Sequence, residues 1–279
     1  MFIALNNSLV AGKVQWPDFA RLAAKVGYGG TDINLAAANR EGLDRTKALL
    51  AELKLRPSFT SLPVNATRGD DAAFRTGMEG LEEQVKFAAG IGCNRMMVTL
   101  PASSQTPKDE LRKMLKDRFT AVGAVLEKYR VQCGFEFLGP LEFRQRAPHV
   151  FIYQMNETMD FASECGPSFG VVLDVWHWYH SGGTLADIRR AGTDQIVLIH
   201  LSDAAKMAPE DVRDNARLMA GEGVIDLVGI FKTLREMGWA GSVSPEPIGR
   251  IPKEMSAEDG AKLGLETARA VMRKAGIQV

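Results

Sequence analysis

Apolar and polar positions alternate along the chain in two regular ways. Short runs of apolar, β-branched and aromatic residues predict strands at residues 2–5, 31–35, 57–62, 95–100, 133–138, 170–175, 196–201 and 242–246. Longer segments with apolar residues at helical spacing predict helices at residues 17–26, 43–53, 80–89, 108–129, 152–164, 185–190, 227–237 and 257–274. Several of these helices end at a glycine, as helices commonly do: Gly27, Gly90 and Gly238.

Strict alternation of strand and helix predicts parallel strands joined by helical crossovers. A chain of 279 residues divided among eight such units suits a closed (β/α)8 TIM barrel, which we expect to form a single domain over residues 1–279. An open, doubly wound sheet is the alternative. Such a sheet usually has a Gly-x-Gly-x-x-Gly loop after its first strand, and residues 6–12 contain none. The barrel is therefore the preferred prediction.

The last four predicted strands each have one metal-binding type of residue near the carboxyl end: Glu136, Asp174, His200 and Glu246. A single acidic residue at a strand end is usually solvated or caps a helix. Four residues of metal-binding types on consecutive strands, at the end of a barrel where active sites form, favour a metal site. Three carboxylates and one imidazole suit Mn²⁺ best, with Mg²⁺, Co²⁺ or Zn²⁺ as alternatives.

Three further side chains are candidates for contact with a substrate. His177 follows Asp174 by three residues, and either donates a hydrogen bond beside the metal or is an ordinary loop histidine. Glu142 either reaches over the pocket or is solvated. Arg217 lies near the end of a long polar connection, residues 202–225, and either binds an oxygen of the ligand or lies on the surface. That connection is long enough to be a lid over the site.

The aromatic residues beside His177 have two interpretations. Trp176, Trp178 and Tyr179 suit either an apolar wall of the ligand pocket or packing under a loop. His180 is expected at the surface or in a loop.

Composition narrows the partners and the compartment. Lysine plus arginine equals aspartate plus glutamate, at 34 each, so a basic surface for duplex nucleic acid is not expected. No signal sequence and no apolar run of about 18 residues is evident, so we expect no membrane partner. The three cysteines, Cys93, Cys133 and Cys165, are widely spaced and suggest reduced thiols in the cytoplasm.

Several segments together resemble the sugar isomerase/epimerase superfamily with a xylose-isomerase-like barrel, which includes ketose 3-epimerases, hydroxypyruvate isomerase, inosose dehydratase and endonuclease IV. Four segments resemble the ligand segments of that family, in order: residues 135–137, 173–177, 199–203 and 244–247. Residues 27–33 resemble its second strand, which commonly has an acidic residue. Residues 220–226 resemble the segment before its seventh helix.

This resemblance implies roles for the candidate residues. Glu136, Asp174, His200 and Glu246 would hold one divalent metal ion, and Glu136 and Glu246 would also move protons. The residues that would contact the substrate are Glu142, His177 and Arg217. The sequence departs from the family in the length of the connection between His200 and Arg217, and in having Leu138 and Gly139 where an asparagine is common.

A hard cation that binds a carbonyl and an adjacent hydroxyl makes the neighbouring C–H more acidic. Proton removal and return by two carboxylates then epimerises or isomerises a ketose or related polyol ketone, and loss of a β-hydroxyl would instead make the protein a dehydratase. An endonuclease IV-like metal hydrolase is disfavoured, because a cluster of three zinc ions would need more than the four histidines present. A non-catalytic sugar-binding protein has no evident need for two proton-transferring carboxylates. The predicted partner is thus a small sugar; the sequence is also compatible with a homo-oligomer.

Overall fold

Strands and helices alternate throughout the computed structural model, which describes residues 1–279. The strands of its main sheet are β1 (Phe2–Leu5), β2 (Gly30–Thr31), β3 (Arg56–Pro57), β4 (Thr60–Ser61), β5 (Arg95–Thr99), β7 (Gln132–Glu136), β9 (Phe169–Asp174), β10 (Ile196–Leu201) and β11 (Ser242–Pro245). The helices at the predicted positions are α1 (Asp18–Val26), α3 (Leu43–Glu52), α5 (Leu81–Gly90), α6 (Lys108–Lys128), α8 (Met155–Cys165), α10 (Leu185–Ala191), α11 (Leu227–Glu236) and α12 (Ala257–Lys274).

Shorter elements lie in the loops between them. They are helices α2 (Leu35–Glu41), α4 (Asp71–Glu79), α7 (Leu141–Arg144) and α9 (Val175–His180), the 3₁₀ turns η1 (Asn7–Val10), η2 (Pro209–Asp211) and η3 (Asp214–Ala216), and the antiparallel pair β6 (Ser103–Ser104) and β8 (His149–Val150).

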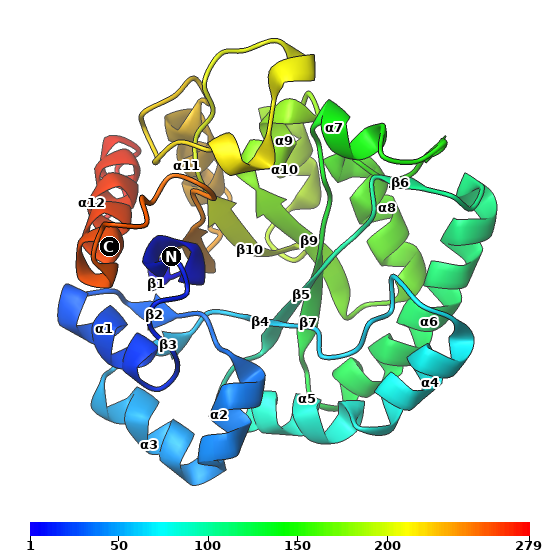
Figure 1. Cartoon of the computed structure of the whole chain (residues 1–279), viewed down its shortest axis with the longest axis horizontal. Coiled ribbons are helices and arrows are strands. Elements are labelled where there is room, and N and C mark those ends of the chain that lie inside the picture. Colours follow the sequence, from blue (N-terminus) through cyan, green and yellow to red (C-terminus); the bar gives the residue numbers. More distant parts are fainter.

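The main sheet closes into a barrel. Its strand order is β3-β2-β1-β11-β10-β9-β7-β5-β4, and every pair in it is parallel. The two end strands, β3 and β4, belong to one stretch of chain, residues 56–61; its first half pairs with β2 and its second half with β5. The nine segments therefore amount to eight strands, and the predicted (β/α)8 TIM barrel is confirmed. Figure 1 shows the helices as a ring around these strands.

Helix α6 illustrates how the sequence covers the barrel. Its buried apolar residues recur every three or four positions, so they share one face: Leu111, Leu115, Phe119, Val122 and Leu126. Full burial of each such side chain contributes about 1.5–3 kcal/mol. Phe119 stacks edge-on against Phe135 of β7, with ring centroids 4.6 Å apart, and so fixes the helix over the strand.

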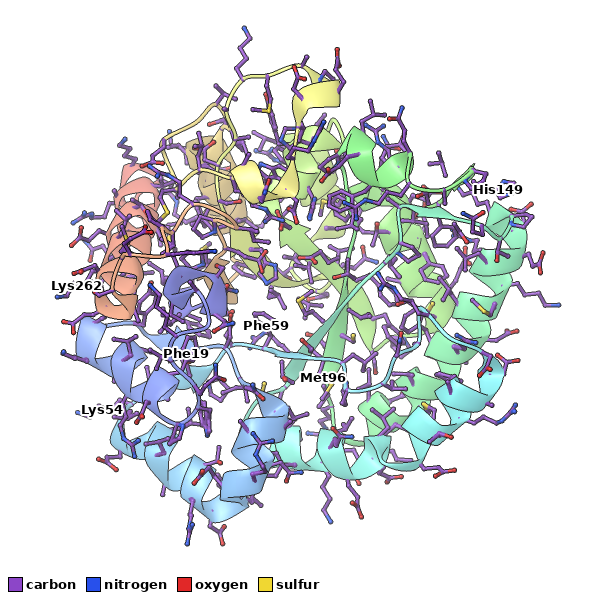
Figure 2. All side chains as sticks on the ribbon, in the orientation of Figure 1. Phe19, Lys54, Phe59, Met96, His149 and Lys262 are labelled. Atoms are coloured by element: carbon purple, nitrogen blue, oxygen red, sulfur yellow. The ribbon has the colours of Figure 1, made fainter.

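The core lies in the barrel and in the layer between strands and helices. Strands β9 and β10 are buried at every residue, as expected for parallel strands covered on both faces. The three cysteines are buried and unpaired. In Figure 2, Phe59 and Met96 lie toward the centre of the molecule, whereas Lys54, His149 and Lys262 lie at its periphery. No helix of the chain combines the length and the apolar character needed to cross a membrane.

Two predicted elements differ from the structure. The strand predicted over residues 31–35 ends at Thr31, and helix α2 begins at Leu35 instead. Asn34 causes this change, because its side chain accepts a hydrogen bond from Ala37 N and caps the helix. The strand predicted over residues 170–175 ends at Asp174, where α9 begins, and α9 was not predicted.

The long connection after β10 is fastened at both ends by one carboxylate. Asp203 accepts hydrogen bonds from four backbone N–H groups, those of Ala204, Gly221, Gly223 and Ile225, at 2.9–3.0 Å. A Cβ atom at residue 223 would lie 2.2 Å from the Ala204 carbonyl oxygen, so only glycine fits there. Between these ends the chain passes outside the barrel, and residues 206–211 are exposed (Figure 1).

Candidate metal centre and pocket

Four side chains converge where four neighbouring barrel strands end. Glu136 and Asp174 are the last residues of β7 and β9, His200 is the second-last residue of β10, and Glu246 directly follows β11. One donor atom from each lies within 4.8 Å of the donor atoms of the others. The structure thus brings together the four residues that the sequence places near the carboxyl ends of the last four predicted strands.

Two of the carboxylates face the same imidazole nitrogen. His200 Nδ1 lies 2.8 Å from Glu136 Oε1 and 3.3 Å from Glu246 Oε2. Burial would lower the pKa of His200, but the carboxylates of Glu246 and Glu136 outweigh burial and raise that pKa to about 10. Thr99 Oγ1 donates a hydrogen bond to Glu136 Oε2 at 2.9 Å and orients that carboxylate.

The two glutamates have pKa values displaced in opposite directions. Burial raises the pKa of Glu246 to about 7. Burial acts in the same direction on Glu136, but the hydrogen bond and charge of His200 outweigh it and lower the pKa of Glu136. Two carboxyl groups with separated pKa values are the arrangement that acid–base chemistry requires.

Asp174 has a structural contact as well as a place in the cluster. Its Oδ1 accepts hydrogen bonds from Trp176 N and His177 N at 2.9 and 3.1 Å, and so caps α9. Its Oδ2 accepts a hydrogen bond from Arg217 Nη1 at 2.8 Å. Burial would raise the pKa of Asp174, but Arg217 outweighs burial and holds that pKa well below its usual range.

Arg217 is buried beside the cluster, although it belongs to the long connection after β10. Its Nη1 lies 3.2 Å from Glu246 Oε2, and Asp214 Oδ1 accepts from its Nε and Nη2 at 2.9 and 2.7 Å. Its guanidinium also lies over the ring of Trp176, 4.7 Å from the centroid. A surface position, the alternative for this arginine, is therefore excluded.

The other two predicted substrate contacts have different surroundings. His177, on α9, is 1% exposed, and its Nε2 lies 3.1 Å from Arg217 Nη2. Burial lowers the pKa of His177, so the neutral ring accepts this hydrogen bond. Glu142, on α7, does not contact the four converging residues. Its Oε1 accepts a hydrogen bond from Asp214 N at 3.2 Å, which connects it to the segment that holds Arg217.

The aromatic residues of α9 pack into the core. Trp176 and Trp178 are 2% and 5% exposed, and neither lines the pocket that opens beside Glu246. His180 is half-buried at the end of α9, with its ring centroid 4.5 Å from that of Trp176. The expectation of a surface or loop position for His180 was wrong, because the segment after Asp174 folds into a helix.

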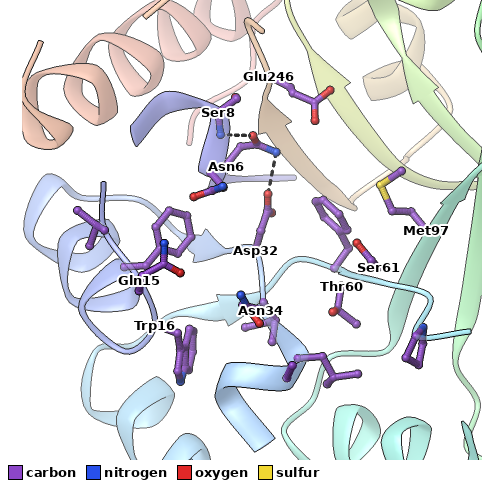
Figure 3. A pocket seen from close by; sticks show the side chains of 18 of the residues that line it. Asn6, Ser8, Gln15, Trp16, Asp32, Asn34, Thr60, Ser61, Met97 and Glu246 are labelled. Carbon is purple, nitrogen blue, oxygen red and sulfur yellow. Dashed lines mark hydrogen bonds between the residues drawn. The ribbon is translucent and has the colours of Figure 1, made fainter. Parts of the chain in front are cut away.

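A pocket of about 750 Å³ opens beside Glu246, between the ends of β1, β2 and β4. Asp32 lines it, and the choice of candidate residues from sequence missed this side chain. Asp32 Oδ1 accepts from Ser244 Oγ at 2.6 Å, and Oδ2 accepts from Asn6 Nδ2 at 2.9 Å. Burial raises the pKa of Asp32 to about 7. Figure 3 shows Asp32 joined to Asn6, with Glu246 on the same side of the pocket.

The converging side chains fit a divalent cation by their chemistry. Arg217 and His200 offset the charge of the three carboxylates in this structure. Three carboxylates with one imidazole are a donor set for hard or borderline divalent ions. The Nε2 atom of His200 is buried and has no hydrogen-bond partner. The polar side chains are therefore not all satisfied by one another, as they would be in a purely structural network.

Fold and site together define a class: a (β/α)8 barrel with a candidate metal-binding cluster at the carboxyl ends of its strands. Residues 20–271 match the sequence model of the xylose isomerase-like TIM barrel family. The chain belongs to this family, as the resemblance of its strand-end segments had indicated.

Two curated relatives are sugar-related enzymes by name. An inosose isomerase from Halalkalibacterium halodurans is 22% identical over 234 residues, which cover 83% of this chain and 80% of the relative. A protein from Escherichia coli K12, SgbU, named as an L-ribulose-5-phosphate 3-epimerase, is 34% identical over 253 residues, covering 86% of each chain. The family kinship is therefore with isomerases and epimerases of sugars.

Two solved structures have the same fold over nearly the whole chain. A xylose isomerase domain protein from Alicyclobacillus acidocaldarius superimposes with a TM-score of 0.89 at 25% identity, covering 98% of this chain and 99% of the other. The IOLI protein, described with a bound zinc atom, superimposes with a TM-score of 0.83 at 20% identity, covering 99% of both chains.

Proposed function

We propose that this chain is a divalent-metal-dependent sugar isomerase or epimerase that acts on a ketose or a related polyol ketone. The observation that carries the proposal is the pair Glu136 and Glu246. Glu136 ends β7 and Glu246 directly follows β11; both contact the same His200 nitrogen, and Glu246 lines a pocket of about 750 Å³. Pockets of about 300–1,000 Å³ accommodate small ligands.

Glu136, Asp174, His200 and Glu246 are the side chains that would hold the metal. When bound there, a divalent ion supplies Lewis-acid polarisation of a substrate carbonyl. Mn²⁺ is the ion that we expect from the carboxylate-rich donor set, with Mg²⁺, Co²⁺ and Zn²⁺ as alternatives. The zinc atom described for the IOLI protein supports a divalent ion for this fold.

In the proposed reaction one glutamate removes the proton from the carbon beside the carbonyl and the other returns a proton. Return to the same carbon from the opposite face gives an epimer, and return to the former carbonyl carbon gives an aldose–ketose isomer.

The remaining candidates would bind and enclose the substrate. Arg217 Nη1 donates to both Asp174 and Glu246, so a substrate oxygen beside them would take over one of these hydrogen bonds. His177 would orient Arg217 or donate to the same oxygen. Glu142 would act through Asp214, which it holds, rather than on the reacting carbons.

Solvent exchange is the direct test of this function. The protein loaded with Mn²⁺ is incubated in D₂O with ketoses, ketose phosphates and inososes, and NMR follows deuterium entering the carbon beside the carbonyl. We expect exchange together with an epimer or isomer as product. Exchange accompanied by loss of water would instead make the protein a dehydratase. No exchange with any of these ketones would contradict the proposal.

A further inference from the structure

The charge of the pocket lining limits what can enter. Only two of its residues are ionisable, Asp32 and Glu246; both are acidic, and Glu246 is also one of the proposed metal ligands. No lysine or arginine lines the pocket. The rest of the polar lining is neutral and consists of amides and hydroxyls, among them Asn6, Gln15, Asn34, Thr60, Ser61 and Gln84. Neutral donors and acceptors of this kind match the hydroxyl groups of a polyol.

A phosphate group would find no counter-charge in this lining. Phosphates in proteins are usually bound by arginine or lysine, or by free N–H groups at a helix start. Helix α2 does start at the pocket, but it has only seven residues, and the Asn34 side chain already accepts from its Ala37 N–H. On the other side, Arg250 after β11 is paired with Glu222 and does not line the pocket.

Asp32 is held as an acceptor that faces the pocket. It lies just after β2, outside the four-residue cluster, and is partly exposed. Ser244 and Asn6 each donate one hydrogen bond to it, one on each carboxylate oxygen. A carboxylate has about four acceptor positions, so positions remain on both oxygens for a ligand.

The two partners of Asp32 are themselves fixed by the barrel. Ser244 lies on β11, two residues before Glu246 and paired in register with His200. Asn6 follows β1, and its Oδ1 accepts from Ser8 N at 2.9 Å. The Asp32 carboxylate is therefore positioned from β1 and from β11, and β11 is also one of the strands that position the candidate metal centre.

We propose that the substrate is an uncharged polyhydroxy ketone, and that Asp32 binds one of its hydroxyl groups while the pocket rejects phosphorylated sugars. This inference rests on the proposed function, because it assumes that a ketone occupies the cluster. It separates this chain from a sugar-phosphate enzyme of the kind for which the Escherichia coli relative is named.

Matched pairs of sugars test the charge preference. The Mn²⁺-loaded protein is given L-ribulose or L-ribulose 5-phosphate, and D-fructose or D-fructose 6-phosphate, with an inosose as a further uncharged probe. Deuterium exchange gives kcat/KM for each, and thermal unfolding gives binding without turnover. We expect kcat/KM to favour the uncharged member by at least about tenfold, the effect of roughly one unpaired charge. A phosphorylated sugar that exchanges as fast or faster would overturn the inference.

Binding measured by thermal unfolding tests this inference separately from the proposed function. If no sugar exchanges deuterium, the proposed reaction fails, but thermal unfolding still decides the substrate class. Stabilisation by uncharged polyhydroxy ketones and not by their phosphate esters supports the inference. Stronger stabilisation by the esters than by the uncharged sugars overturns it, whether or not turnover is seen.

Substitution of Asp32 tests its own role. With the preferred uncharged ketone, Asp32→Ala should raise KM by about 10- to 100-fold, as expected for loss of a hydrogen bond to a charged group, while kcat changes little. Mn²⁺ affinity should be unchanged. Asp32→Asn keeps the shape and removes the charge, so it should raise KM less than Asp32→Ala does. It should also lower the ratio of kcat/KM for the uncharged ketone to kcat/KM for its phosphate ester.

The control is Asp117→Asn, the same chemical change at an exposed position on α6. It should leave KM, kcat and the sugar preference unaltered. If Asp32→Ala is too unstable to purify, the Asp32→Asn result stands alone. Wild-type KM and wild-type sugar preference in whichever Asp32 variant is obtained would overturn the role of Asp32.

Discussion

At the scale of single residues, substitutions of Glu246 and of His200 are expected to have different effects, although both residues belong to the cluster. Glu246→Gln keeps the size and one oxygen donor but removes the base, so turnover should fall by a factor on the order of 10²–10⁴ while metal affinity falls moderately. His200→Ala should mainly lose metal. Deuterium exchange and metal titration measure the two effects separately.

Excess Mn²⁺ distinguishes a ligand from a proton carrier. It should partly restore activity to His200→Ala, because mass action compensates weaker binding, and should not restore Glu246→Gln. Near wild-type turnover of Glu246→Gln at saturating Mn²⁺ would mean that Glu246 is a ligand alone. The proton-transfer mechanism with two carboxylates would then be wrong.

His180 gives a pH-dependent contribution to stability. Burial lowers its pKa from 6.5 to about 4, so the unfolded chain binds the proton more readily than the folded chain does. The contribution is therefore complete above pH of about 6.5 and is lost as the pH falls toward about 4. His180→Gln removes this titration. The difference in unfolding free energy between wild type and variant, from urea titrations, should increase with pH across this range.

Some of the site could be predicted at this scale and some could not. Each of the four converging residues was marked by a polar side chain in an apolar strand, which is a contrast that sequence displays. Asp32 was marked only by the resemblance of residues 27–33 to the second strand of the family, which gave it no contact, and its partner Ser244 is 212 positions away. Only closure of the barrel, which places β2 and β11 on either side of β1, brings these two residues together.

At the scale of elements, the long helices were predicted well and the short ones were not. The bounds of α12 match the prediction, because its apolar stripe extends over eighteen residues and Ser256 caps it. Helix α9 has six residues, and five of its side chains are aromatic or imidazole, which gives no helical pattern. It exists because Asp174 caps it and because its tryptophans are buried, and both causes depend on tertiary structure.

The connection after β10 is the element that we expect to move. Residues 206–211 are exposed, while Arg217 at its far end is buried in the site. Closure over a bound ketone would exclude water and protect backbone amides. Hydrogen exchange of residues 205–216 should slow when an uncharged ketone binds to the Mn²⁺-loaded protein. Amides of α6, on another side of the barrel, serve as the control. Unchanged exchange in residues 205–216 would argue against a lid.

At the scale of the whole molecule, metal binding should raise stability. An ion that binds only the folded chain stabilises it by mass action, by about 2.7 kcal/mol at 100 times Kd. Treatment with a chelator should therefore lower Tm and abolish deuterium exchange into the ketone substrate, and Mn²⁺ or Co²⁺ should restore both. Scanning calorimetry with and without added ion measures the first effect. Full activity after verified removal of metal would contradict the metal requirement.

The way in which Asp203 fastens the connection after β10 has a consequence for how such a barrel can diversify. Since one carboxylate ties Ala204 to residues 221–225, the entry and exit of this loop are set independently of what lies between them. Insertions or deletions among residues 206–211, which lie beside α7, would alter the cover over Arg217 without displacing the strands below. Loops of other lengths and sequences could therefore replace this one, in evolution or by grafting, and change the range of sugars that the protein accepts. The strands that carry the site residues would stay unaltered.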